Sequence, residues 1–160
     1  MAKFNTTDWG DQFQTPPEIC AFMCKMIDLS NAEVLEPYPG KGNLVRSIEA
    51  AGGRPVRNLS ESTKICVMNP PFSPMKDGYK TLDRMTDSVD FIVALMPWLT
   101  LINGEKRLAK ILDYGLVSIT HLPRKTFPGA RVQTCILNMR RGFTGITKFS
   151  AYVPDDSWMD

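Results

Sequence analysis

Residues 65–74 read ICVMNPPFSP and pass from an apolar run directly into two consecutive prolines. The first four residues have the apolar character of a buried strand, whereas a proline cannot donate a backbone hydrogen bond and has a fixed φ. The strand is therefore predicted to end at Met68. A rigid turn follows it and carries one amide side chain, Asn69, and one aromatic ring, Phe72.

A short buried strand is also predicted at residues 33–36, and its last residue begins the glycine-rich loop EPYPGKG. This loop lacks the Gly-Lys-Ser/Thr ending of a phosphate-binding P-loop, and Val45 stands where a dinucleotide fingerprint has its third glycine. An ordinary tight turn would also explain Gly40 and Gly42. Glu36 separates these alternatives, because a carboxylate at the start of the loop repels phosphate but can pair with the ammonium group of an amino-acid-like ligand.

Apolar strands alternate with helical segments along the chain, which predicts an α/β fold with a doubly wound, mostly parallel sheet. Ligands bind such sheets beyond the carboxyl ends of the strands, where the strand order reverses. The glycine-rich loop and the proline turn both follow strands, so both are expected at that edge of the sheet. The expected strands are 33–36, 54–61 (weak and polar), 64–68, 91–96, 116–122 and 133–139. The expected helices are 15–29, 43–51, 77–87 and 105–112, and the polar tail has some β character.

The first of these helices has a sharp predicted start. Thr15 is expected to cap it, Pro16 to occupy the first helical position and Glu18 to complete a capping box. The polar residues before it, 1–14, are expected to be flexible.

The bulk properties are those of an ordinary globular protein. The chain has 160 residues, of which 43% are hydrophobic and 22% charged, with a net charge of +2. This length suits one domain, and the charge is too small to indicate nucleic acid by itself. The N-terminus lacks a signal-peptide apolar region and no run reaches membrane-spanning length, so we expect a cytoplasmic protein.

The cysteines and the single histidine argue against metal chemistry. Cys20, Cys24, Cys66 and Cys135 form no C-x-x-C pair, and His121 is far from all of them in sequence. We therefore expect buried, reduced thiols and no metal site.

The glycine-rich loop resembles the cofactor loop of class I S-adenosylmethionine-dependent methyltransferases, in which an acidic residue precedes Gly-x-Gly by three further residues. This resemblance implies S-adenosylmethionine as cofactor. It also implies that Glu36 faces the ammonium group of the methionine moiety, directly or through water, while Gly40 and Gly42 let the cofactor lie against the backbone.

The NPPF sequence resembles the [N/D/S]-P-P-[Y/F/W] motif of amino-methyltransferases. The lone pair of an exocyclic amine such as adenine N6 is delocalised into the ring, which makes the amine a poor nucleophile. The resemblance implies that the Asn69 side-chain oxygen and the Pro70 carbonyl accept its two N–H groups and favour a tetrahedral nitrogen. Pro71 would stiffen this substrate-binding turn, and Phe72 would stack on a flipped base. Asn69 would also lie beside the cofactor.

The order of the motifs resembles the gamma-order adenine-N6 DNA methyltransferases over roughly residues 8–142. In that family the Thr-Pro pair, here Thr15 and Pro16, heads a helix that packs over the methionine end of the cofactor. The segment with Phe127 and Gly129 resembles a late β-hairpin beside the catalytic pocket.

The stretch between Gly42 and Asn69 is shorter than in that family, so we expect one edge strand and one helix to be missing. Glu61 stands about 20 residues after the glycines, where the ribose-binding acid is placed. Only Ser62 and Thr63 separate it from the next strand, so a solvated turn residue is the alternative.

A separate target-recognition domain is also missing from the sequence. Near the hairpin, contact with nucleic-acid phosphate is expected from Arg124, Lys125 and Arg131, although a solvated face is the alternative. These three belong to a predicted basic cluster that also includes Arg140 and Arg141.

These observations favour a minimal adenine-N6 DNA methyltransferase domain at residues 15–142, followed by an extension at 143–160. Its small size is typical of viral or mobile genomes. The rival hypothesis is a catalytically silent module that binds nucleic acid, cofactor or a partner subunit, and the same turn could serve RNA or a protein glutamine. Self-association through the shortened sheet edge, or a separate recognition subunit, is a further expectation.

Overall fold

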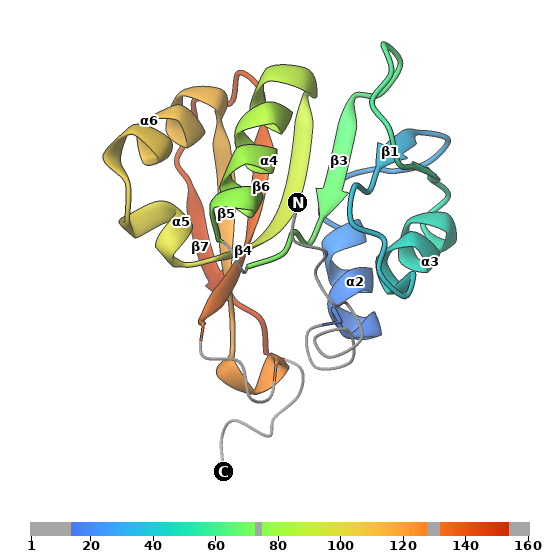
Figure 1. The fold of residues 1–160 in the computed structure, drawn as a ribbon, viewed down its shortest axis with the longest axis horizontal. Coiled ribbons are helices and arrows are strands. Elements are labelled where there is room, and N and C mark those ends of the chain that lie inside the picture. The colour runs from blue at the N-terminus through green and yellow to red at the C-terminus, as the bar shows by residue number, and fades with distance from the viewer. Residues whose placement is uncertain (1–13, 73–74, 128–131, 154–160) are drawn as a thin grey trace.

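The computed structural model describes residues 14–72, 75–127 and 132–153. Its seven-stranded sheet has the order β2-β1-β3-β4-β6-β5-β7 and is mostly parallel, with β6 antiparallel to both of its neighbours (Figure 1). The strands are β1 (Glu33–Leu35), β2 (Arg54–Val56), β3 (Ile65–Met68), β4 (Phe91–Pro97), β5 (Leu116–Leu122), β6 (Thr134–Arg140) and β7 (Lys148–Ala151). The predicted doubly wound α/β sheet is thereby confirmed.

Helices cover both faces of the sheet. They are α2 (Pro17–Cys24), α3 (Asn43–Ala50), α4 (Met75–Ser88), α5 (Leu99–Ile102), α6 (Glu105–Tyr114) and the 3-10 helix η1 (Arg124–Thr126). On one face, α2 and α3 pack over Val67 and Val93, while on the other α4, α5 and α6 pack over Cys66 and Ile92. Because the central strands are buried on both faces, they read as continuous apolar runs.

The strand order reverses between β1 and β3. These two strands are paired in parallel, with Leu35 opposite Cys66, while the chain continues outward from β1 to β2 and from β3 to β4. Their carboxyl ends, followed by Glu36 and Asn69, therefore lie side by side. In Figure 1 the arrowhead of β3 points to the lower edge of the sheet, where α2 and η1 also lie.

The connection from β2 to β3, residues 57–64, contains no further helix or strand, so β2 forms one edge of the sheet. This agrees with the expected shortening. The Glu33 carboxylate holds the connection by accepting hydrogen bonds from three hydroxyl groups, those of Ser60 (2.9 Å), Ser62 (3.0 Å) and Thr63 (2.5 Å). These hydrogen bonds, with that of Thr63 first, lower the pKa of Glu33.

Helix α2 differs from its predicted form at both ends. Pro16 rather than Thr15 is its N-cap, no side chain caps it, and Pro17 is its first residue. The helix ends at Cys24, although Leu29 is still buried beyond it. The apolar pattern of residues 25–29 therefore reflects packing of turns and not helical structure.

The tail forms the opposite edge of the sheet. Strand β7 pairs in parallel with β5, placing Phe149 opposite Ile119. Tyr152 follows it and stacks edge-to-face on Phe22 of α2, with 5.0 Å between the ring centroids. The segment just after β7 thus contacts the helix that follows Thr15.

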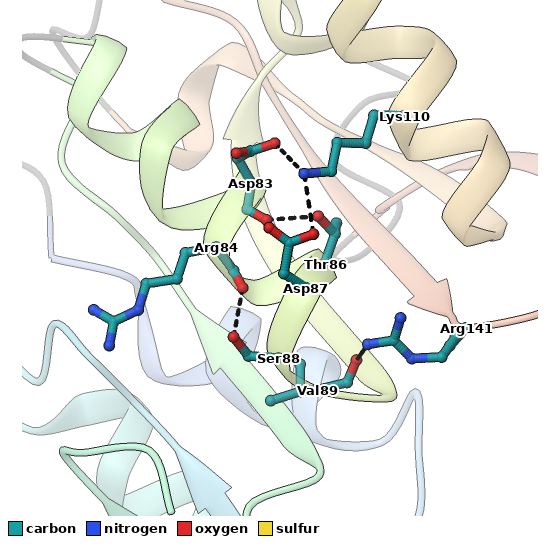
Figure 2. Close-up of polar contacts among 8 residues, drawn as sticks. All are labelled: Asp83, Arg84, Thr86, Asp87, Ser88, Val89, Lys110 and Arg141. Carbon is teal, nitrogen blue, oxygen red and sulfur yellow. Dashed lines mark hydrogen bonds and ion pairs between the residues drawn. The ribbon is translucent and has the colours of Figure 1, made fainter.

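Ionic contacts surround the C-terminal half of α4, as Figure 2 shows. Lys110 of α6 contacts Asp83 (2.5 Å) and Asp87 (3.2 Å). Arg141, just beyond β6, pairs with Asp90 (3.0 Å) and donates to the carbonyl of Val89 (2.7 Å).

Within the part of the chain that the structure describes, no helix has the length and apolarity needed to span a bilayer.

Candidate active site

The glycine-rich loop after β1 and the NPPF turn after β3 meet in one pocket. Its volume is about 80 Å³, and it is lined by Gln14, Thr15, Glu36, Tyr38, Pro39, Gly40, Asn43, Leu44 and Asn69. Gly40 and Asn69 thus lie at the same end of the sheet, beside the point where the strand order reverses, as expected for doubly wound folds. Pockets for complete drug-sized ligands measure roughly 300–1,000 Å³, so this one suits the polar end of a larger ligand.

Glu36 is the most unusual group in the pocket. Its side chain is 1% exposed. One carboxylate oxygen, Oε1, accepts a hydrogen bond from the backbone N–H of Tyr38 at 2.7 Å. The other, Oε2, is buried and has no hydrogen-bond partner within the described part of the chain. A buried carboxylate oxygen without a partner is costly, so this atom favours a ligand that brings a positive charge or an N–H donor.

Burial raises the pKa of Glu36 from an ordinary 4.5 to about 8. The folded protein therefore retains a proton that the unfolded chain releases above about pH 4.5. The stabilising effect of that proton is complete below pH 4.5 and is lost as the pH rises towards 8.

We expect the unfolding free energy of the wild type, relative to Glu36→Gln, to decrease by about 1 kcal/mol per pH unit between pH 5 and 8. Urea titrations of both proteins at pH 5, 6.5 and 8 measure this difference. A difference that does not change with pH would show that Glu36 titrates normally.

Asn69 projects from the end of β3 and is partly buried. Its amide Nδ2 donates to the hydroxyl of Thr15 at 2.5 Å, and no described residue donates to its Oδ1. Pro70 behind it is buried and contacts Gly78 of α4, where an added Cβ would come within 3.1 Å of the Pro71 carbonyl oxygen. The proline turn is therefore held tightly, with an amide oxygen available to accept a hydrogen bond.

Phe72 is also at this end of the sheet, but it does not line the pocket. It is partly buried and packs against the cluster formed by α2 and α3. Part of the Phe72 ring thus has a role in packing.

Two glycines of the loop have a backbone conformation that residues with a side chain rarely adopt. Gly40 has φ +50° and Gly42, the N-cap of α3, has φ +88°. A Cβ at Gly42 would meet only the mobile end of Arg46, at 3.0 Å, so backbone strain and not collision opposes a larger residue there.

Gly42→Ala is expected to lower the unfolding free energy by about 1–2 kcal/mol, the cost of the left-handed conformation, and to weaken ligand binding at the loop. The matched control is Gly142→Ala: Gly142 has φ +83°, has open space around it and lies beyond β6. Urea denaturation should give similar losses for both, and titration calorimetry should show weaker cofactor binding for Gly42→Ala alone. Equal weakening in the two variants would contradict this role of the loop.

Five pocket residues were not predicted as site residues from the sequence, namely Gln14, Tyr38, Pro39, Asn43 and Leu44, and three of them make side-chain hydrogen bonds to distant segments. Asn43 donates from Nδ2 to the Thr15 carbonyl at 3.0 Å. Gln14 accepts from the Lys41 backbone N–H at 3.3 Å. The Tyr38 hydroxyl is hydrogen-bonded to Thr81 of α4. The spacing of the glycines gave the loop position, but no sequence signal indicated these long-range contacts.

Other predicted site residues are not brought to the pocket. Glu61 lies in the exposed turn held by Glu33, which is at the amino end of β1, the opposite end from Glu36. Arg124 and Lys125 are exposed in η1 at the carboxyl end of β5.

The predicted basic cluster does not form as one surface. Strand β6 runs antiparallel and pairs Arg140 with Phe91, at the start of β4. Arg140 and Arg141 therefore lie at the end of the sheet opposite the pocket. Arg131 and Gly129 lie outside the described residues.

All four cysteines are free and buried, as predicted. Burial raises the pKa of Cys20 to about 12, so its thiol stays protonated at neutral pH. Among residues 14–72, 75–127 and 132–153, no group of three or more His, Cys, Asp or Glu side chains could hold a metal ion.

Several solved structures share this architecture. A protein described as a modification subunit of a type I restriction enzyme from Vibrio vulnificus is 15% identical, with a TM-score of 0.68 over 89% of this chain and 48% of that one. A protein described as a class I S-adenosylmethionine-dependent methyltransferase from Listeria monocytogenes is 13% identical, with a TM-score of 0.63 over 92% and 68%. The fold is that of class I methyltransferases.

A type I restriction-modification methyltransferase subunit from Streptococcus thermophilus is also similar, at 14% identity and a TM-score of 0.61 over 88% of this chain and 47% of that one. The chain thus spans about half the length of these restriction-modification subunits. No protein-family model and no curated protein sequence matches it.

Proposed function

We propose that the protein transfers a methyl group from S-adenosylmethionine to the N6 amine of adenine in DNA. The observation that carries this proposal is the meeting of Glu36 and Asn69 in one pocket. One residue offers a buried carboxylate oxygen, and the other an amide oxygen, and neither oxygen has a hydrogen-bond partner among the described residues. A cofactor with an ammonium group and a substrate with an exocyclic amine satisfy both.

The cofactor fits the residues present. Glu36 would accept a hydrogen bond from its ammonium group, and Gly40 and Gly42 would let it approach the backbone. Thr15, which lines the pocket, and Pro16, next to it in the chain, would lie beside its methionine end. When bound, S-adenosylmethionine supplies an electrophilic methyl group on a sulfonium. Because the turn with Glu61 lies at the other end of β1, we do not assign a ribose contact to it.

The chain's own groups would prepare the amine. Asn69 Oδ1 and the Pro70 carbonyl would accept its two N–H groups, favouring a nitrogen whose lone pair points at the methyl group. Pro71 would keep this turn rigid. The part of the Phe72 ring that is not packed on the core would stack on the flipped base.

The substrate is inferred from the NPPF turn and from the neighbours named as restriction-modification subunits. Arg124 and Lys125, in the η1 helix at the pocket's end of the sheet, would contact phosphate, with Arg131 beside them in sequence. Because those neighbours are named as subunits, we propose that a partner or a second copy contributes DNA-binding surface.

The test is to incubate the pure protein with tritiated S-adenosylmethionine and, separately, unmethylated DNA, RNA or bulk protein, with Asn69→Ala in parallel. Label in the N6 position of adenine that depends on Asn69 is the expected result. Label in RNA or in protein glutamine would show that the substrate is RNA or protein and not DNA. Calorimetric binding of the cofactor without transfer to any acceptor would instead favour the silent binding module.

A further inference from the structure

Thr15 connects the glycine loop to the NPPF turn. Its side chain is 5% exposed and lies directly before α2, with its hydroxyl oxygen 2.5 Å from Nδ2 of Asn69, a residue 54 positions later. Its backbone carbonyl accepts from Nδ2 of Asn43, at the start of α3, and from the thiol of Cys20 (3.0 and 3.5 Å). Contacts to two separate elements thus hold the backbone of Thr15 in place.

An asparagine side chain has two nearly isosteric ends, and rotation about its terminal bond is broadly two-fold. The prolines after Asn69 fix its backbone but not this rotation. If the amide turned over, its NH₂ group would face the substrate amine, and donor would meet donor. The contact with Thr15 holds one end of the amide on the side of α2, and in the structure that end is Nδ2, which leaves Oδ1 for the substrate. The Thr15 hydroxyl can donate or accept, so it fixes the place of the amide, and the substrate's N–H group selects the oxygen.

We propose that Thr15 is a positioning residue that holds one end of the Asn69 amide beside α2, so that the other end faces the substrate amine. This inference rests on the proposed function, since the correct orientation matters only if Oδ1 accepts a hydrogen bond from the substrate amine. It differs from a cofactor contact of Thr15 because it acts on the transfer step and not on cofactor affinity.

Thr15→Val removes the hydroxyl but keeps the side-chain shape, whereas Thr15→Ser keeps the hydroxyl. We expect Thr15→Val to lower the single-turnover transfer rate about 10- to 100-fold, because misplacement of a reacting group has effects of this size. Cofactor Kd, from calorimetry, should change less than about threefold, because Thr15→Val keeps the shape beside the cofactor and removes only the hydroxyl that is bonded to Asn69. Thr15→Ser should restore most of the rate.

Thr86→Val is the matched control. Thr86 is also 5% exposed and loses one hydrogen bond on substitution, to the carbonyl of Asp83 (2.6 Å), but it lies in the C-terminal half of α4 (Figure 2). Its transfer rate should match the wild type. A comparable loss of rate in Thr86→Val would overturn the proposal, since general destabilisation would then explain Thr15→Val.

A second readout does not depend on activity. The side-chain amide signal of Asn69 in a ¹H–¹⁵N spectrum, assigned by its disappearance in Asn69→Asp, should shift and exchange faster with water in Thr15→Val. It should be unchanged in Thr15→Ser and Thr86→Val. An unchanged signal in Thr15→Val overturns the proposal, above all if cofactor affinity falls, which would make Thr15 a cofactor contact. If the wild type methylates no acceptor, the proposed function fails, whereas this signal still reports whether Thr15 orients Asn69.

Discussion

Asn69→Ala is expected to lower methyl transfer at least about 100-fold while leaving cofactor affinity nearly unchanged. Removing one preorganised hydrogen-bonding group from a reacting centre typically lowers the rate by about 10²–10³. Asn69 is the side chain whose amide oxygen reaches the pocket without a described donor. Its loss leaves the amine with only the Pro70 carbonyl as an acceptor. Single-turnover transfer to DNA at saturating cofactor measures the effect.

Asn58→Ala is the control for this substitution. Asn58 is exposed in the connection between β2 and β3, away from the pocket. Its transfer rate should equal that of the wild type. Transfer by Asn69→Ala within about threefold of the wild type would be far from the expected effect and would remove Asn69 from the mechanism.

The second large effect is expected for Glu36→Gln, which should raise the cofactor Kd about 10- to 100-fold, as expected for a buried charge-assisted hydrogen bond. The substitution keeps the shape and removes the charge that faces the ligand's ammonium group. Because burial raises the pKa of Glu36 to about 8, most of the ligand-free protein carries a proton there at pH 7. An approaching ammonium group favours the carboxylate, so binding below pH 8 should release a proton.

Titration calorimetry in two buffers of different ionisation enthalpy measures both the Kd and the released proton. Glu33→Gln is the matched control, because Glu33 lies on the same strand but at its amino end, among hydroxyl groups. Its Kd and proton release should match those of the wild type. Unaltered affinity in Glu36→Gln would mean that the cofactor's ammonium group is held elsewhere.

The sequence was sufficient to predict that the two loops lie together, because prolines and glycines mark the ends of strands. Both strands were apolar and short, so Glu36 and Asn69 had to leave the sheet at its carboxyl edge, and parallel pairing brought them together. The expected shortening beyond β2 followed from the few residues between Gly42 and Asn69.

Contacts between distant segments could not be predicted in this way. The capping propensity of Thr15 is a local preference, and the hydrogen bond to Asn69 replaced it. Spacing suggested a role for Glu61, but the short connection turns back to Glu33. The basic cluster depended on strand direction, and the antiparallel β6 carries Arg140 to the far end of the sheet.

A crystal structure with S-adenosylhomocysteine, the product left after transfer, is the most direct test of the central claim. The account predicts the ammonium group within hydrogen-bonding distance of Glu36 Oε2 and the sulfur facing Asn69 across the pocket between Thr15 and Gly40. A ligand bound at another place on the sheet, or with its amino-acid end pointing away from Glu36, would contradict it.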